Sequence, residues 1–176
     1  NYCFLSQISD QPHYGGANFI GQGDQRGDFM LNSNAAAKFT ILVEIKKPST
    51  NLLAKRSNQF DKYRNGAYRI SSELTGGIAQ LQINCKTWQR SAYEADNYDI
   101  LSKSGIFTVQ PKGILVVGNT SEFENRQQAE SFELFRRNIS NPEIITYDEL
   151  LERAKFIVAN ERECEDENIE LEEMDL

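Results

Sequence analysis

The pattern of hydrophobic and polar positions is clearest over residues 28–46. Asp28 to Leu31 is a short, mainly apolar segment, and Phe39 to Lys46 is rich in the β-branched and aromatic side chains that strands favour. Between them, Asn32-Ser33-Asn34 supplies residues typical of turns. The two segments predict a β-hairpin. Pro48 ends it, because proline lacks the N–H that a strand ladder needs.

The segments on either side of this hairpin are less regular. Residues 1–12 are ambiguous, and the stretch from His13 to Gly27 places five glycines around one short apolar piece, Ala17 to Ile20. We expect a weak strand there, followed by a flexible turn. After the hairpin, residues 49–69 are expected to form a loop or a short helical insert.

Helix and strand signals alternate over the second half of the chain. Ser71 to Ala95 has apolar side chains at helical spacing, with Ser71 or Ser72 as the N-cap. The apolar run from Gly113 to Gly118 predicts a strand that is buried on both faces, in the central region of the sheet. The remaining segments predict a helix from Ser121 to Asn138, a strand from Glu143 to Thr146 and a helix from Tyr147 to about Val158. This order predicts an α/β fold with a mixed central sheet flanked by helices.

The charge distribution is uneven along the chain. The formal net charge of −7 argues against a nucleic-acid partner, but residues 161–176 alone hold nine Asp or Glu and one Arg. The other 160 residues carry 18 Lys or Arg against 26 − 9 = 17 Asp or Glu, so the body is near neutral. A local surplus marks a candidate phosphate-facing edge for DNA, made of Lys46, Lys47, Lys55, Arg56, Lys62, Arg64 and Arg69, with Asp61 as its one acid.

Length and composition predict one domain over residues 1–160, followed by an acidic tail at 161–176. The tail is most simply a solvated, disordered extension, and the alternatives are an inhibitory mimic of nucleic acid or a contact with a partner domain. No apolar run is long enough for a membrane span and no signal peptide is apparent, so we expect a cytoplasmic protein. Because the chain begins with Asn1 rather than Met, we interpret it as a fragment of a longer protein.

Candidate chemistry is concentrated at the end of the best-predicted strand. Side chains alternate across a strand, so Glu44 and Lys46 share one face. With a turn centred near Ala36, paired positions sum to about 72, which sets Asp28 opposite Glu44. Opposed carboxylates repel, and a hard cation such as Mg²⁺ or Mn²⁺ would offset the repulsion, with the backbone carbonyl of Ile45 as a further ligand. Lys46 would stand beside the metal, able to orient or deprotonate an attacking water.

Several stretches of the chain carry a family resemblance. The segments Gly27-Asp28-Phe29-Met30-Leu31 and Leu42-Val43-Glu44-Ile45-Lys46-Lys47-Pro48 resemble the PD-(D/E)xK nuclease superfamily. The chain also resembles one branch of it, the Shedu group of bacterial anti-phage defence nucleases, over residues 25–158. Three further segments carry that likeness: Ile78-Ala79-Gln80-Leu81-Gln82, Gly113-Ile114-Leu115-Val116-Val117-Gly118 and Ile144-Ile145-Thr146-Tyr147-Asp148-Glu149-Leu150-Leu151.

The resemblance implies a restriction-endonuclease-like core and a Mg²⁺-dependent DNA endonuclease of anti-phage defence that self-associates as a homo-oligomer. Carried over by position, it implies that Asp28 and Glu44 bind Mg²⁺, for which Mn²⁺ can substitute, and that Lys46 is catalytic. Gln80 would assist from the neighbouring helix. The family often has an acidic residue on a helix before the first strand, and residues 1–12 offer only Asp10 for that place.

Two other functions stay open. One is a catalytically silent nucleic-acid-binding module of the same fold, and the other is a nuclease that acts on RNA or on branched DNA in repair. The candidate site residues also have alternative interpretations that involve no catalytic or binding role. Glu-x-Lys alone is often an exposed charged pair, Gln80 can be a structural hydrogen-bonding residue, and the basic stretch can be a solvated loop. Trp88 and Tyr93 are expected to pack in the core or an interface.

Overall fold

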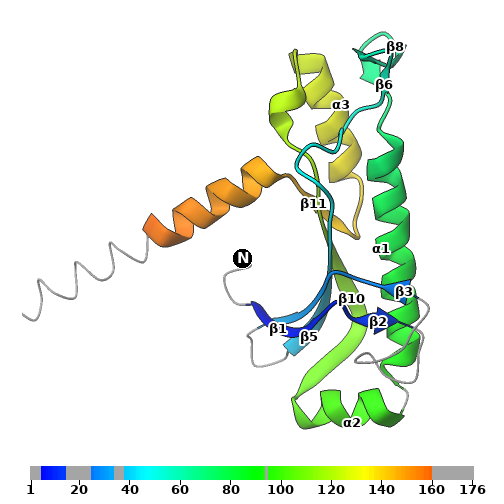
Figure 1. Ribbon diagram of the computed structural model, residues 1–176, viewed down its shortest axis with the longest axis vertical. Coiled ribbons are helices and arrows are strands. Elements are labelled where there is room, and N and C mark those ends of the chain that lie inside the picture. The colour runs from blue at the N-terminus through cyan, green and yellow to red at the C-terminus, as the bar shows by residue number, and fades with distance from the viewer. Residues whose placement is uncertain (1–4, 15–24, 34–37, 94, 160–176) are drawn as a thin grey trace, which may run out of the picture.

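A five-stranded sheet forms the centre of the molecule (Figure 1). The computed structural model describes residues 5–14, 25–33, 38–93 and 95–159. In sheet order, the strands are β1 (Leu5–Asp10), β4 (Phe29–Ser33), β5 (Lys38–Ile45), β10 (Ile106–Val116) and β11 (Glu143–Ile145). Neighbours among β1, β4 and β5 run antiparallel, whereas β5, β10 and β11 are parallel. The predicted α/β fold with a mixed sheet is therefore confirmed.

Strand β10 is longer than the predicted run from Gly113 to Gly118, because it already begins at Ile106. Its pairing with β5 is interrupted between Phe107 and Lys112, and Gln110 has a φ of 51°. Pro111 lies at this break and cannot donate to the ladder, so the sequence pattern shows only the second half of the strand. From Gly113 onward the strand is buried on both faces, as predicted.

Helix α1 (Ser72–Ser91) covers one face of the sheet and contacts β10 and β5. Its N-cap is Ser71, one of the two predicted, whose hydroxyl accepts a hydrogen bond from the backbone N–H of Leu74 at 3.0 Å. The helix ends at Ser91 rather than at the predicted Ala95, and a separate helix α2 (Ala95–Lys103) follows. The side-chain amide of Asn97 donates to the carbonyl of Ser91 at 2.8 Å, which stabilises the break between the two helices.

The last elements follow the predicted order with shifted boundaries. The predicted helix from Ser121 to Asn138 divides into a short 3-10 turn, η1 (Thr120–Glu122), and α3 (Arg126–Arg137). Asn125 caps α3 by accepting from Gln128 N at 3.1 Å, so the helix starts after it. Strand β11 leads into a helix of residues 147–159, which projects away from the sheet (Figure 1). Among the described residues, none of the helices is both long and apolar enough to span a bilayer.

The sheet has an apolar cluster on each face. The larger cluster lies between the sheet and α1, and the smaller one lies on the opposite face. Sheet residues of the larger cluster are Met30, Leu42, Leu115 and Ile144, which pack with Leu74, Ile78, Leu81 and Trp88 of α1. The smaller cluster contains Ile41, Val43, Ile114, Val116 and Ile145, with Phe29, Leu31 and Tyr147 packed against it. Alternation along β5 therefore assigns each of its residues to one face.

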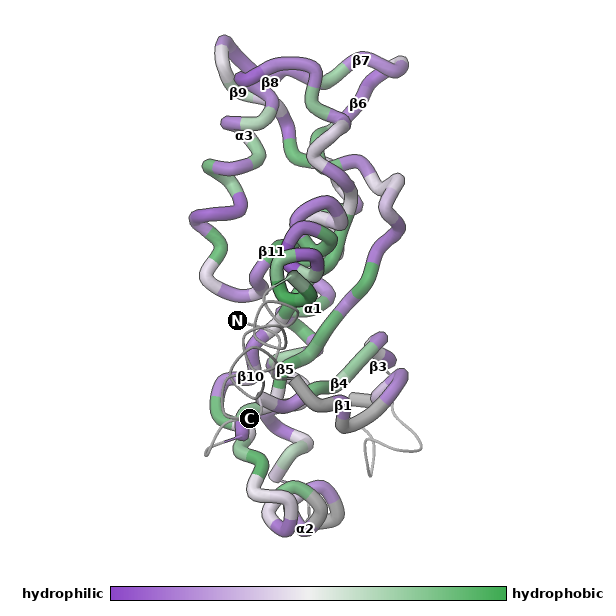
Figure 2. The backbone as a smooth tube through the Cα atoms, turned by 90° about the vertical axis from the view of Figure 1, so that its left-hand side faces the viewer, coloured by the Kyte–Doolittle hydropathy of each residue, from purple (hydrophilic) through white to green (hydrophobic). Residues whose placement is uncertain are grey.

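The segment between β5 and α1 forms strands, and the expectation of a loop or short helical insert there is wrong. Two small hairpins pair β6 (Lys55–Arg56) with β7 (Gln59–Phe60), and β8 (Lys62–Arg64) with β9 (Ala67–Tyr68). We call residues 55–69 the head. It lies beyond the N-terminal end of α1 and is largely hydrophilic (Figures 1 and 2). Its turns rest on positive φ angles at Ser57, Asn58 and Gly66.

The N-terminal residues form more β-structure than their sequence indicates. Residues 5–10 of the ambiguous stretch form β1, and a small hairpin pairs β2 (His13–Tyr14) with β3 (Gln25–Arg26). The predicted strand at Ala17 to Ile20, the turn at Ala36 and the acidic tail at 161–176 lie outside the described residues.

Candidate functional site

The hairpin of β4 and β5 sets the geometry of the predicted site. Its ladder pairs Phe29 with Val43, Met30 with Leu42, Leu31 with Ile41 and Asn32 with Thr40. The paired numbers sum to 72 throughout, which confirms the predicted register. The next pair in this register is Asp28 and Glu44, one residue beyond the ladder.

Three predicted residues meet at this point. The carboxylate of Asp28 accepts a hydrogen bond from the backbone N–H of Ile45 at 2.6 Å. The ammonium group of Lys46 lies 2.7 Å from Oε1 of Glu44 and donates to it. The side chain of Glu44 is 12% exposed and that of Lys46 is 31% exposed, so the ion pair is largely shielded yet reachable from solvent. Alternation places this polar group on the α1 face of the sheet, next to the larger apolar cluster.

Helix α1 approaches Lys46 through a glycine. A Cβ atom added at Gly77 would lie 3.5 Å from Cε of Lys46 and 3.3 Å from a methyl carbon of Leu115. Any larger side chain there would press on the stem of Lys46 and on the core. The glycine pair Gly76-Gly77 looks like a weakness in a helix, but Gly77 allows α1 to pack closely at the site. Sequence analysis missed this role.

The backbone around Lys46 is held by β10, by Gly118 just after that strand, and by the helix of residues 147–159. Lys46 N donates to the carbonyl of Val116 at 2.8 Å, and Gly118 N donates to the carbonyl of Lys47 at 3.4 Å. The hydroxyl of Tyr147 donates to the carbonyl of Lys46 at 2.7 Å. Tyr147 is thus a second residue with a role at the site that sequence analysis did not assign. Its only sequence signal was membership in a segment that resembles the family.

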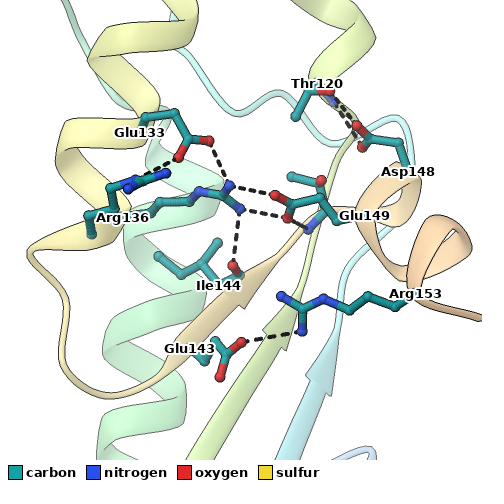
Figure 3. A network of polar contacts seen from close by, with 10 residues as sticks. Thr120, Glu133, Arg136, Glu143, Ile144, Asp148, Glu149 and Arg153 are labelled. Carbon is teal, nitrogen blue, oxygen red and sulfur yellow. Dashed lines mark hydrogen bonds and ion pairs between the residues drawn. The ribbon is translucent and has the colours of Figure 1, made fainter. Parts of the chain in front are cut away.

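The 147–159 helix that carries Tyr147 is fixed at its start by a polar network (Figure 3). Arg136 on α3 makes two hydrogen bonds to the carboxylate of Glu149 and an ion pair with Glu133 at 2.6 Å. Asp148 accepts hydrogen bonds from the backbone and the hydroxyl of Thr120. The network ties α3, η1 and the helix together, so Tyr147 has little freedom to move away from Lys46.

Hydrogen bonding sets the charge state of this network. Burial on its own would raise the pKa of Glu149, but the hydrogen bonds from Arg136 and from the backbone of Thr146 outweigh it and hold that pKa below its ordinary value. The bond to Glu149, opposed by burial, likewise raises the pKa of Arg136. Burial also opposes ionisation of Asp148, and the two bonds from Thr120 lower its pKa nonetheless. All three groups are therefore charged at neutral pH.

Other predicted site residues lie outside this constellation. Gln80 is exposed on α1, and its amide donates to Asn84 Oδ1 at 2.9 Å, so its proposed assistance to the site stays a prediction. Lys47 is exposed directly after the site, and Lys55, Arg56, Lys62 and Arg64 lie in the head. Trp88 is fully buried in the core, as predicted, whereas Tyr93 is 63% exposed and does not belong to the core.

The oxygen atoms available at the site suit a hard cation. They are the carboxylates of Asp28 and Glu44 and the backbone carbonyl of Ile45. Within the described residues, no group of three or more His, Cys, Asp or Glu side chains could hold a metal ion. Asp10 pairs with Phe29 across β1 and β4, so it lies on the face opposite Glu44. A cation at this site would therefore keep several water ligands, as Mg²⁺ commonly does.

Two comparisons with known proteins place these residues in context. The sequence profile of a family described as "Shedu protein SduA, C-terminal" matches residues 1–151. The "Shedu protein SduA" of Bacillus cereus (strain B4264) is 31% identical over 153 residues. That alignment covers 86% of this chain and 39% of the Bacillus protein, so the chain spans about two fifths of the length of this relative.

Proposed function

The chain belongs to the Shedu SduA C-terminal family, and from this premise we propose that it is a Mg²⁺-dependent nuclease domain of the PD-(D/E)xK type. It would hydrolyse phosphodiester bonds of DNA in bacterial defence against phage, in the cytoplasm. The observation that carries the proposal is the meeting of Asp28, Glu44 and Lys46 at the end of one hairpin, where Glu44 and Lys46 share one face of the sheet and Asp28 bonds the backbone between them.

The donor set supports the choice of metal. Asp28 and Glu44 would hold Mg²⁺, with Mn²⁺ as a substitute, and the carbonyl of Ile45 would complete the protein's share of ligands. The bound cation would neutralise charge on the phosphate and lower the pKa of a bound water. The N–H of Ile45 already orients the Asp28 carboxylate at 2.6 Å, so this ligand is positioned in advance.

The proposal gives Lys46 the catalytic role, and its contacts support that choice. Its ammonium group lies beside Glu44 and is fixed by the packing of Gly77 and by the backbone contacts of Val116 and Tyr147. There it would orient the attacking water and stabilise the negative charge that develops as the new P–O bond forms and the old one breaks. We propose that the contacts of Gly77, Val116 and Tyr147 serve to hold the Lys46 amine in place for this reaction.

Binding of DNA would use the exposed cations near the site. Lys47 follows the site directly, and the head contributes Lys55, Arg56, Lys62 and Arg64 as contacts to phosphates. A near-neutral body offers a limited positive surface, so several subunits would collect more of it together. We propose self-association as a homo-oligomer for this reason.

One observation favours a second candidate, the catalytically silent nucleic-acid-binding module. The described residues hold only two carboxylates at the site, and Glu44 is already paired with Lys46. If this ion pair persists when nucleic acid binds, the fold recognises nucleic acid without cleaving it. The experiment below separates the two candidates. RNA among its substrates addresses a nuclease of the same fold that acts on RNA.

The test is incubation of the whole chain with supercoiled DNA, linear DNA and RNA, in the presence of Mg²⁺ or of EDTA. We expect cleavage of DNA in Mg²⁺ only. Lys46→Ala should reduce the rate by about 10²–10⁴-fold, the usual contribution of a positioned acid–base group. The matched control is Lys103→Ala, an exposed lysine on α2, which should retain the full rate.

A titration of Mn²⁺ followed by calorimetry gives a readout that does not depend on activity. Asp28→Ala should weaken binding by about tenfold or more, because it removes one of two charged ligands. Cleavage that persists in EDTA or in Lys46→Ala contradicts the proposed mechanism. Unchanged Mn²⁺ affinity in Asp28→Ala contradicts the proposed metal site, and DNA binding without any cleavage supports the silent module.

A further inference from the structure

The head is a firmly attached, positively charged projection. Its last residues contact α3, where Tyr68 N donates to the hydroxyl of Ser131 at 3.2 Å, and that hydroxyl lies 3.3 Å from the carbonyl of Gly66. Backbone hydrogen bonds join Ala54 to Arg69 and to Asp61 at 2.8 Å each. The two hairpins are therefore held in one arrangement before any ligand arrives, which reduces the entropic cost of binding.

Much of the positive charge of the head is unopposed. It has five basic residues and one acid, Asp61, which pairs with Arg69 at 3.3 Å. Lys55 lies 4.0 Å from Glu122 of η1. In the part of the chain that the structure describes, no carboxylate forms an ion pair with Arg56, Lys62 or Arg64. These three cations are available to phosphate groups.

One aromatic ring of the head differs from the other two. Phe60 and Tyr68 are partly buried, and their rings meet edge to face with centroids 6.4 Å apart. Tyr63 is 56% exposed. The guanidinium group of Arg69 lies 4.5 Å from the centroid of the Tyr63 ring, and that of Arg64 lies 5.5 Å from it. The two guanidinium groups lie over this exposed ring, so ring and cations together form one group of flat π surfaces with positive charge.

We propose that Tyr63, with Arg64 and Arg69, forms a stacking site for one unpaired nucleobase, while Arg56 and Lys62 contact the flanking phosphates. The inference rests on the proposed function in that it takes nucleic acid as the ligand. Every base offers a π face, so such a site binds with little sequence preference. In an intact duplex the faces of the bases are covered by their neighbours. The site therefore selects substrates with single-stranded or extruded nucleotides.

The fold connects this stacking site to the cleavage site. Helix α1 begins at Ser72, just after the head, and Gly77 on the same helix is the residue that packs against Lys46. The five helical residues from Ser72 to Gly77 span roughly 7.5 Å along the axis, and Tyr63 in β8 lies further out, beyond the start of α1. The strand that carries an unpaired base at Tyr63 would have to follow α1 over more than this distance to reach Glu44 and Lys46. Recognition of the unpaired base would place the adjoining strand for cleavage.

The test measures binding of the whole chain to labelled oligonucleotides in EDTA, so that no cleavage occurs. The ligands are a single strand of about 12 nucleotides, a blunt duplex of the same sequence, and single strands in which 2-aminopurine replaces one base. We expect Tyr63→Ala to weaken single-strand binding by about 5- to 100-fold and duplex binding by less than about twofold. Tyr63→Phe, which keeps the ring, should bind like the wild type. Quenching of 2-aminopurine by the wild type should be lost in Tyr63→Ala.

The matched control is Tyr98→Ala on α2, a tyrosine of similar exposure at 53%, which should change neither ligand's affinity. Equal losses on single strand and duplex, or no loss in Tyr63→Ala, would overturn the stacking site. So would a wild type that binds neither ligand. Mg²⁺-dependent cleavage that needs Lys46 but not Tyr63 overturns the stacking site and leaves the proposed function intact. Tyr63-dependent binding without cleavage in Mg²⁺ supports the stacking site and contradicts the proposed nuclease function.

Discussion

The sheet and the head both position polar side chains, but different interactions hold those side chains in the two regions. In the sheet, Glu44 and Lys46 are fixed by an apolar strand whose alternate residues are buried on both faces, so their direction follows from the core. In the head, strands of two or three residues bury only the rings of Phe60 and Tyr68 in part, and turn residues and backbone hydrogen bonds fix the cations.

The difference predicts where each region is tolerant of change. A side chain at the site depends on packing that extends through the whole core, so nearby changes of volume disturb it. A side chain of the head depends on a local turn and projects into solvent. Substitutions of the sheet should therefore affect folding and activity together, whereas substitutions of the exposed cations of the head should affect binding alone.

Two glycines with positive φ test this contrast most strongly. Gly118 has a φ of 60°, and a Cβ there would lie 2.6 Å from the carbonyl oxygen of Thr50 and 2.7 Å from a methyl carbon of Leu52. Gly118→Ala must both strain the backbone and displace its neighbours, so we expect a loss of about 2–4 kcal/mol in the free energy of unfolding. Urea denaturation followed by Trp88 fluorescence measures it.

The matched variant is Gly66→Ala in the head. Gly66 has a φ of 79°, but a Cβ there would meet nothing within 4 Å. Only the backbone strain remains, and the expected loss is about 1 kcal/mol. Equal losses in the two variants would mean that the clash at Gly118 costs nothing beyond backbone strain, and the contrast between the sheet and the head would fail.

Glu149 supplies a second, smaller test through its pH dependence. Because its folded-state pKa lies below the ordinary 4.5, its contribution is complete above pH 4.5 and is lost as the pH falls through the folded-state value. Glu149→Gln should lower the free energy of unfolding by about 1.5–3 kcal/mol at neutral pH, the range for hydrogen bonds to charged groups. The deficit relative to wild type should shrink under acidic conditions.

The control for this measurement is Glu152→Gln on the same helix. The side chain of Glu152 is 71% exposed and pairs with Lys155 at the surface, so its removal should change stability by less than about 0.5 kcal/mol. Denaturation curves for Glu149→Gln and the wild type that stay a constant distance apart from pH 7 to pH 3 would rule out the assigned role of the carboxylate.

The head cations provide the smallest effect on folding. The double variant Arg56→Ala, Lys62→Ala should change stability by less than about 0.5 kcal/mol, because both side chains are exposed. DNA affinity should fall, and the slope of log affinity against log salt should become shallower by about one for each lost phosphate contact. Fluorescence anisotropy at several salt concentrations measures both. An unchanged slope would show that the head does not touch phosphates.

The parts of the fold that sequence predicted are those in which burial repeats with a regular period. The β4–β5 hairpin, the N-cap of α1 at Ser71 and strand β11 all follow from local pattern or cap chemistry. The first half of β10 could not be seen, because Pro111 and the bulge beside it interrupt the pattern. The head hairpins were missed because charged residues carry no burial signal.

Strand alternation and hairpin register predicted which side chains lie together at the site. These place Glu44, Lys46 and Asp28 together, in agreement with the strand pairs and hydrogen bonds of the structure. The supporting contacts were beyond reach, since Gly77 and Tyr147 meet Lys46 only through tertiary packing. The local sequence around a glycine in a helix, or around a tyrosine after a strand, does not indicate which distant residue it contacts in the fold.

The hydrogen bond from Tyr147 to the carbonyl of Lys46 joins residues 101 positions apart in the chain. During synthesis the carboxylates leave the ribosome long before the tyrosine does, at about 5–20 residues per second. A nascent chain therefore carries both acidic groups for several seconds without the contact that fixes the backbone beside them. Under the proposed function, the domain would acquire its full ability to cut nucleic acid only late in its own translation.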